Sequence, residues 1–318
     1  MDPGPWGPGM DVILHIGAHR TATTTFQAWM LQNADALAAG GIAYWGPDRT
    51  RAGLFSGLVK RPDLVTPEDG TALSRLRTAL AFELDRLADQ GMRHLVISEE
   101  NLLGAMPQCV DMLTLYPDAA GRLERARQVL GEHLGGVALS MRRYDMWWSS
   151  VLSVMAGRGT GLPDARGLAR LADHPRGWPE VIAQAQTALG ATVTVWSHEA
   201  LGAEPQAQLQ ALVPGEGLPA GLFDARKRRN AAPGRAALRE GLLRAGHRVA
   251  AGPGRWMPFD QVQRAQMTAR YLEDLTWLRR APPGLNFVEM TAEDAGKTPA
   301  AATVEEGFGH DGQERGLA

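Results

Sequence analysis

Residues 11–33, DVILHIGAHRTATTTFQAWMLQN, join an apolar run, a short polar loop and a helical pattern. The apolar run ends at Gly17, and three consecutive threonines at 23–25 open the helical pattern. A loop that enters a helix N-terminus presents backbone N–H groups and a favourable dipole to an anion. The threonine hydroxyls add hydrogen-bond donors, and Arg20 adds positive charge. This segment predicts a phosphate-binding loop, with an ordinary strand-to-helix turn capped by threonine as the alternative.

The loop departs at two positions from the nucleotide-binding pattern G-x-x-x-x-G-K-[ST]. Gly17 and Thr24 fit it, whereas Ala22 replaces the second glycine and Thr23 replaces the lysine. That lysine and the hydroxyl beside it serve the β- and γ-phosphates and a magnesium ion in NTP-using enzymes. The loss of the lysine, and with it of the G-K-[ST] ending, argues against ATP hydrolysis and makes a kinase the weakest of our hypotheses.

A second anion-binding segment is predicted in residues 139–153, LSMRRYDMWWSSVLS. Arg142 and Arg143 stand where an apolar strand ends, and Asp145 is a candidate N-cap for the following helix. A guanidinium at a strand end, with the Ser150 hydroxyl just beyond it, holds a phosphate from two sides. The alternative is a solvated arginine pair beside surface serines. The adjacent Trp147 and Trp148 are interpreted as core.

The elements that must position these residues alternate between strands and helices. Such alternation predicts an α/β fold with three layers, in which a central parallel sheet carries helices on both faces. We expect strands at 11–17, 94–98, 136–141 and 192–196 and helices at 23–40, 71–90, 118–133, 145–157, 178–189, 234–250 and 258–280. Residues 11–291 are expected to form one domain between a flexible N-terminus at 1–10 and a disordered tail at 292–318.

Polar segments follow all four predicted strands. They read HIGAHRTATTT, SEEN, RRYD and SHEA in chain order. Ligands bind outside the carboxyl ends of the strands in open parallel sheets. We therefore expect the four segments to contribute to one site. For His198 and Glu199, in the fourth segment, a cap before the next helix is the favoured interpretation.

Composition excludes several classes of protein. The chain has 318 residues, of which 44% are hydrophobic and 21% charged, so it can bury a large core. Its net charge of −2 gives no support to nucleic-acid binding. Cys109 is the only cysteine, which excludes an intramolecular disulfide and a cysteine-based metal site. Neither a signal peptide nor a membrane-spanning apolar run is present, so we expect a cytoplasmic protein without an integral membrane segment.

Together the two segments resemble the sulfotransferases that use 3′-phosphoadenosine-5′-phosphosulfate (PAPS), particularly bacterial members. The first loop of that family resembles H-K-T-G-T-T-x-x-Q, matched here by HRTATTTFQ from His19 to Gln27. The spacing from Arg142 to Ser150 matches the family's arginine–serine pair, and VISEENLLG at 96–104 is similar to its S-x-E-N-L segment. The resemblance spans roughly residues 11–240 and implies a fold like that of the P-loop NTPases.

The resemblance also implies roles for individual residues. The 5′-phosphosulfate of PAPS would lie in the loop formed by Arg20, Thr21, Ala22, Thr23, Thr24 and Thr25. Arg20, which stands where the family has lysine, would stabilise the leaving group. The 3′-phosphate would bind Arg142 and Ser150, with Arg229 and Asn230 as weaker candidates. Glu100 would deprotonate a hydroxyl or amine acceptor, and His19 would contact the phosphate or the acceptor.

This resemblance implies sulfuryl transfer without a metal, to a small-molecule or carbohydrate acceptor. Sulfuryl carries less charge than a terminal phosphoryl, so the reaction needs positive charge near the bridging oxygen rather than a bridging magnesium. Because Arg20 and Ala22 depart from the family loop, a nucleotide-binding scaffold that has lost turnover and acts through a protein partner is the main alternative. Neither the acceptor nor the oligomeric state follows from the sequence.

Overall fold

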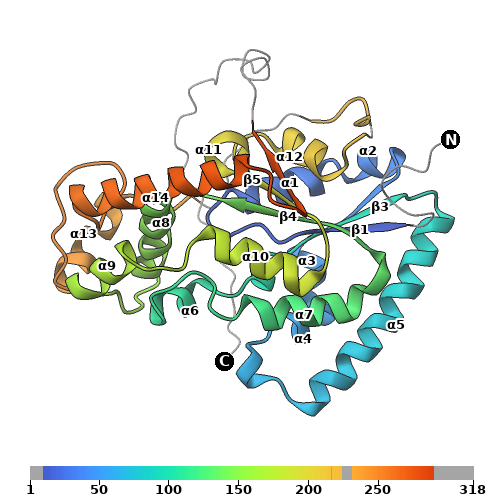
Figure 1. Cartoon of the computed structure of the whole chain (residues 1–318), viewed down its shortest axis with the longest axis horizontal. Coiled ribbons are helices and arrows are strands. Elements are labelled where there is room, and N and C mark those ends of the chain that lie inside the picture. The colour runs from blue at the N-terminus through green and yellow to red at the C-terminus, as the bar shows by residue number, and fades with distance from the viewer. Residues whose placement is uncertain (1–9, 216, 224–230, 290–318) are drawn as a thin grey trace.

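The computed structural model describes residues 10–215, 217–223 and 231–289, and their strands form one six-stranded parallel sheet (Figure 1). In spatial order the strands run β2-β3-β1-β4-β5-β6. Their bounds are β1 Asp11–His15, β2 Ile42–Trp45, β3 His94–Ser98, β4 Leu134–Met141, β5 Val193–Ser197 and β6 Leu285–Val288. The four predicted strands are confirmed, and β2 and β6 are additional strands at the two edges of the sheet.

The direction of chain winding changes at β1. After β1 the chain runs to β2 and β3 on one side, and it then crosses to β4, β5 and β6 on the other. In registered pairs, His15 of β1 lies beside Ser98 of β3 and beside Ala138 of β4. Such a switch point opens a crevice at the carboxyl ends of the strands. The loop after β1 lies at this crevice.

Alternate residues of the central strands face two separate apolar layers. Val12 and Leu14 belong to the larger core cluster, which also includes side chains of five helices: α5 (Pro67–Asp89), α7 (Ala119–Leu130), α8 (Tyr144–Gly157), α10 (Trp178–Leu189) and α14 (Gln261–Arg279). Ile13 belongs to the other cluster, with Phe26 and Trp29 from α1 (Thr23–Gln32). Figure 1 shows α1, α2 (Ala34–Ala39) and α12 (Pro205–Leu212) on one side of the sheet, and α7 and α10 on the other. The chain is therefore α/β with helices on both faces of a parallel sheet.

All seven predicted helices have counterparts in the structure. They are α1 Thr23–Gln32 with α2 Ala34–Ala39, α5 Pro67–Asp89, α7 Ala119–Leu130, α8 Tyr144–Gly157, α10 Trp178–Leu189, α13 Arg235–Arg244 and α14 Gln261–Arg279. The sequence patterns did not predict α9 Ala165–Ala172, α12 Pro205–Leu212 or the short helices α3 Pro47–Arg49, α4 Ser56–Val59, α6 Met106–Asp111 and α11 His198–Leu201. A helix of one or two turns carries too few apolar repeats for its period to stand out.

Two boundaries differ from the prediction for local reasons. The helix expected at 23–40 is interrupted at Asn33, whose side-chain amide donates to the Trp29 carbonyl at 2.9 Å. The helix expected to begin at residue 71 begins instead at Pro67, because Asp69 accepts a hydrogen bond from the Thr66 amide at 2.7 Å.

The predicted tails lie almost entirely outside the described residues. Met10 is described, and it is 8% exposed and packed against the larger core cluster. Within the described ranges, no helix combines the length and the apolar character that crossing a bilayer requires.

Candidate functional site

The loop after β1 has an unusual backbone. Gly17, Arg20 and Ala22 have positive φ values of 47°, 66° and 70°. The left-handed region is unfavourable for residues other than glycine, so the loop holds strain at two positions. Ala22 is the N-cap of α1, and no side chain caps that helix. The threonine cap that the alternative interpretation expected is therefore not found.

Two of the loop hydroxyls point inward. Thr21 Oγ1 donates to the Ala18 carbonyl at 2.6 Å, and Thr23 Oγ1 donates to the same carbonyl at 3.1 Å. Thr21 Oγ1 also lies 2.5 Å from Ser140 Oγ at the end of β4. Both hydroxyls therefore stabilise the loop conformation, and the Thr21 hydroxyl also links the loop to β4. Thr25 is buried as well, whereas Thr24, like Ala22, is half-buried.

Arg20 and Arg142 join the two predicted anion-binding segments. Arg20 Nε donates to Ser150 Oγ at 3.0 Å, and Arg142 Nη1 donates to the Arg20 carbonyl at 2.6 Å. Arg142 is only 5% exposed and Ser150 only 2%. The arginine–serine pair therefore lies against the loop and is not a solvated surface pair. The sheet brings these residues together because β1 and β4 are neighbours.

The neighbouring Arg143 and Asp145 have other roles. Arg143 is the N-cap residue of α8 and Asp145 lies inside the first turn, so the prediction of Asp145 as N-cap is wrong. The Asp145 carboxylate accepts two hydrogen bonds from the Arg143 guanidinium, at 2.7 and 3.0 Å. Glu199, after β5, accepts from the Arg143 amide at 3.2 Å and from the Tyr271 hydroxyl at 2.8 Å.

His19 is held in the loop by residues from two other segments. Its amide donates to the Tyr116 hydroxyl at 2.8 Å, and its Nδ1 lies 3.2 Å from the same oxygen. Its Nε2 lies 3.3 Å from Asn101 Oδ1, just after β3. Burial lowers the pKa of His19 more than the nearby Glu100 carboxylate and the Asn101 hydrogen bond raise it. The imidazole is therefore neutral at neutral pH.

Glu100 is held by one residue on each carboxylate oxygen. Gln27 Nε2, from α1, donates to Oε2 at 2.8 Å, and Arg51 Nη2 donates to Oε1 at 2.9 Å. Burial raises the pKa of the Glu100 carboxyl, but electrostatic attraction to the His19 ring and the Arg51 guanidinium, together with the Gln27 hydrogen bond, outweighs it, so the pKa lies below its ordinary value. Glu100 is therefore a carboxylate at neutral pH, with lone pairs left to accept a proton.

Glu99 is bound to residues outside the loop. Its side chain is fully buried and accepts from Thr50 Oγ1 at 2.6 Å and from Arg51 Nε at 3.0 Å. Its Oε1 also accepts from the Asn101 amide at 3.1 Å. Glu99 is therefore the structural member of the pair, and it anchors Arg51 next to Glu100.

Several contacts of this site had little or no support in the sequence. Arg51 lies in the irregular segment Thr50–Leu54, where no periodic pattern draws attention to it. Tyr116 lies in a loop far from both motifs. Gln27 belongs to the HRTATTTFQ match but had no role assigned to it.

The remaining candidates lie elsewhere or outside the described residues. Ser197 is the N-cap of α11 and accepts from the Ala200 amide at 3.0 Å, so neither His198 nor Glu199 is the cap. Arg229 and Asn230 lie outside the described residues. Within the described ranges, no group of three His, Cys, Asp or Glu side chains is arranged to hold a metal ion. Cys109 is buried, and burial raises its thiol pKa to about 12.

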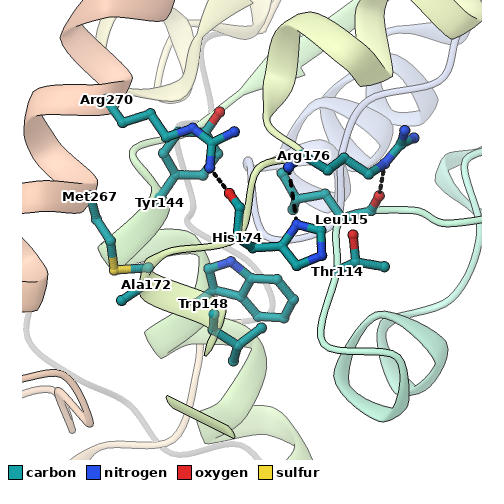
Figure 2. Close-up of a pocket in the computed structure, with 10 residues that line it drawn as sticks. Thr114, Leu115, Tyr144, Trp148, Ala172, His174, Arg176, Met267 and Arg270 are labelled. Carbon is teal, nitrogen blue, oxygen red and sulfur yellow. Dashed lines mark hydrogen bonds between the residues drawn. The ribbon is translucent and has the colours of Figure 1, made fainter. Parts of the chain in front are cut away.

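The small cavity in Figure 2 lies behind the aromatic side chains of α8 and not at the loop. Tyr144, Trp148, His174, Arg176 and Arg270 contribute to its wall. Figure 2 shows His174 between the two arginines. Arg270 donates to the His174 carbonyl, and Arg176 donates to the Leu115 carbonyl at 2.5 Å. The cavity has a volume of about 10 Å³, which is close to the space that one water molecule needs. This cavity cannot hold a nucleotide.

Comparisons with known proteins identify no relative of this chain. No family model, no curated protein and no solved structure matches this chain.

Proposed function

We propose that the protein is a PAPS-dependent sulfotransferase with a fold of the P-loop type. The observation that carries the proposal is the contact between the two predicted anion-binding segments. Arg20 reaches Ser150 at 3.0 Å, and Arg142 reaches the Arg20 carbonyl at 2.6 Å. One nucleotide with phosphates on both its 3′ and 5′ oxygens needs two anion sites this close together.

The donor side of the reaction is assigned to the loop and the end of β4. The N-terminus of α1, which has no side-chain cap, would receive the 5′-phosphosulfate on its backbone amides. Arg20 would stabilise the negative charge that grows on the bridging oxygen as 3′,5′-adenosine bisphosphate leaves. Arg142 and Ser150 would bind the 3′-phosphate. Thr21 and Thr23 keep the loop in shape through the Ala18 carbonyl.

The acceptor side is assigned to Glu100. Its carboxylate would take the proton from a hydroxyl or amine as the acceptor's new bond to sulfur forms and the bond from sulfur to the bridging oxygen breaks. Gln27 and Arg51 fix the orientation of Glu100, and neutral His19, within the loop, contacts Asn101 next to Glu100 in the chain. Glu100 would supply the base and Arg20 the cation that sulfuryl transfer needs.

A thermal-shift titration with 3′,5′-adenosine bisphosphate, run beside ATP with magnesium, tests the proposal. Ligand at about 100 times its dissociation constant adds about 2.7 kcal/mol of stability. For a chain of this size that raises the unfolding midpoint by several degrees. A rise with the bisphosphate alone supports the proposal, a rise with ATP alone favours a kinase, and no rise with either contradicts both.

One observation favours a second candidate, a nucleotide-binding scaffold without turnover. The Arg20 side chain donates to Ser150, on the 3′ side, and its planar guanidinium is less suited than an ammonium to a single bridging oxygen. Arg20→Lys distinguishes the candidates in assays of sulfuryl transfer from PAPS to phenol, sugar and amine acceptors. Transfer by the wild type supports the enzyme. Transfer that appears only in the variant supports the scaffold.

A further inference from the structure

Two buried tryptophans donate hydrogen bonds to the backbone of the two anion-binding segments. Trp147 Nε1 donates to the His19 carbonyl at 2.6 Å, directly before Arg20. Trp178 Nε1 donates to the Arg142 carbonyl at 2.8 Å. Both indoles are fully buried. Each bond fixes the peptide group next to a cation of the proposed site.

The backbone positions held in this way need support. Arg20 has a positive φ of 66°, which a residue with a side chain adopts only where the surroundings impose it. The peptide between His19 and Arg20 is held on its carbonyl by Trp147, and the His19 amide is held by the Tyr116 hydroxyl. Tyr116 in turn packs edge-on against Trp147, with ring centroids 5.7 Å apart.

The two tryptophans also pack against each other. The rings of Trp147 and Trp178 meet edge-to-face with centroids 6.0 Å apart, and Tyr144 stacks on Trp178 at 6.1 Å. Such contacts between aromatic rings favour defined geometries, and buried rings have little freedom to rotate. The indoles of α8 and α10 therefore form one rigid support beneath both segments.

We propose that Trp147 and Trp178 are positioning residues, each of which sets the backbone of one anion-binding segment through its indole N–H. This inference rests on the proposed nucleotide-binding function and assigns each half of the nucleotide to one tryptophan. Trp147 supports the loop that takes the 5′ group, and Trp178 supports the arginine that takes the 3′-phosphate. Neither residue touches the ligand.

Two nucleotides that each lack one group test this division. Adenosine 5′-phosphosulfate has no 3′-phosphate, and 3′-AMP has no 5′ group. Replacing each tryptophan in turn by benzothienylalanine keeps the ring and its packing but removes the N–H donor, and Trp→Phe at the same position is the genetically simpler variant. Binding is measured by calorimetry on the full chain.

The expected result is a crossed pattern. Loss of the N–H at Trp147 lowers the affinity for adenosine 5′-phosphosulfate by roughly three- to tenfold, the worth of one hydrogen bond, and lowers the affinity for 3′-AMP less. Loss of the N–H at Trp178 lowers the affinity for 3′-AMP by the same factor and the affinity for adenosine 5′-phosphosulfate less. Trp148→Phe is the matched control, since Trp148 is 2% exposed and packs on Trp147 at 4.7 Å, but its indole donates no hydrogen bond to the loop or to Arg142 within the described part of the chain. It should leave both affinities within about twofold.

If the tryptophans had a purely structural role, each variant would bind both nucleotides equally more weakly. That result, or unchanged binding by the benzothienylalanine variants, overturns the inference. Failure of the proposed function has a different signature. In that case the wild-type protein binds neither of the two nucleotides nor 3′,5′-adenosine bisphosphate, and the inference fails with it.

Discussion

Arg20 Nε donates to Ser150 Oγ over 3.0 Å, although 130 residues separate the two in the chain. The contact links the loop after β1 to the second turn of α8 and makes one cluster of two sequence motifs. It also places the loop cation next to a hydroxyl assigned to the 3′ side. An incoming nucleotide would therefore have to separate Arg20 from Ser150, or bind with both.

Replacing Arg142 with alanine should weaken binding of 3′,5′-adenosine bisphosphate by about 1.5–3 kcal/mol, the scale of a hydrogen bond to a charged group. Arg142 is buried and its Nη1 also holds the Arg20 carbonyl, so both anion-binding segments lose a contact. Calorimetric titration measures the change. Arg158→Ala is the control, because Arg158 is exposed at the other end of α8 and carries the same charge. Unchanged affinity in Arg142→Ala would count against the assignment.

Removing Arg51 should raise the pKa of Glu100, since a nearby cation favours the carboxylate. Arg51→Gln alone would leave the buried Glu99 carboxylate without its ion pair, so it is combined with Glu99→Gln. A ¹³C NMR titration of the Glu100 carboxyl, assigned with Glu100→Gln, measures the shift.

The same change has a consequence for activity. A higher pKa at Glu100 moves the acid limb of the pH profile to higher pH, because the base is protonated earlier as the pH falls. Arg49→Gln is the control, since Arg49 pairs with Glu83 and lies over the Trp45 ring. Glu99→Gln alone is the reference, because loss of its negative charge lowers the Glu100 pKa. A Glu100 pKa that is no higher in the Arg51 and Glu99 double variant than in Glu99→Gln would show that Arg51 does not tune this carboxylate.

Ala22→Gly should stabilise the protein by roughly 0.5–1 kcal/mol. The left-handed conformation at Ala22, with φ of 70°, costs a residue other than glycine about 1–2 kcal/mol. Glycine avoids this cost, but its greater conformational freedom in the unfolded chain offsets part of the stabilisation. Ala28→Gly, in the middle of α1, should instead lose roughly 0.5–1 kcal/mol. Urea unfolding compares the two, and equal losses would mean that the loop strain is relieved in some other way.

Asp274→Asn should stabilise the protein at pH 8 and have little effect at pH 4. Burial raises the Asp274 pKa to about 6, against the lowering effects of the Tyr144 hydrogen bond and Arg270. The folded state thus holds a proton that the unfolded state loses above pH about 4, and stability falls as the pH rises through about 6. The cost reaches roughly 3 kcal/mol at most. Thermal unfolding across this pH range measures it.

The exposed neighbour gives the control for that experiment. Glu273→Gln removes a carboxylate of the same helix that faces solvent, so its effect on the unfolding midpoint should be small at every pH. If Asp274→Asn and Glu273→Gln show the same pH dependence, Asp274 does not titrate as its buried position implies.

The local pattern predicted most of the fold. The strands β1, β3, β4 and β5 are short runs rich in Val, Leu and Ile, as expected for strands covered on both faces. The helices α10 and α14 lie within three residues of their predicted bounds, because a 3.6-residue period over several turns is a strong signal. The edge strands β2 and β6 have four residues each, too few for their period to be recognised.

The candidate site was also only partly predictable from the sequence. The sequence by itself determined which residue types stand at the strand ends, including Arg20, Glu100, Arg142 and Ser150, because motifs are local. Only the tertiary structure decided that β1 lies between β3 and β4, and this order places all four around one crevice. It also decided that Thr21 and Thr23 point inward, that Arg51 reaches Glu100 and that two indoles hold the loop and the end of β4. Those contacts join residues far apart in the chain, and no local pattern encodes such a pairing.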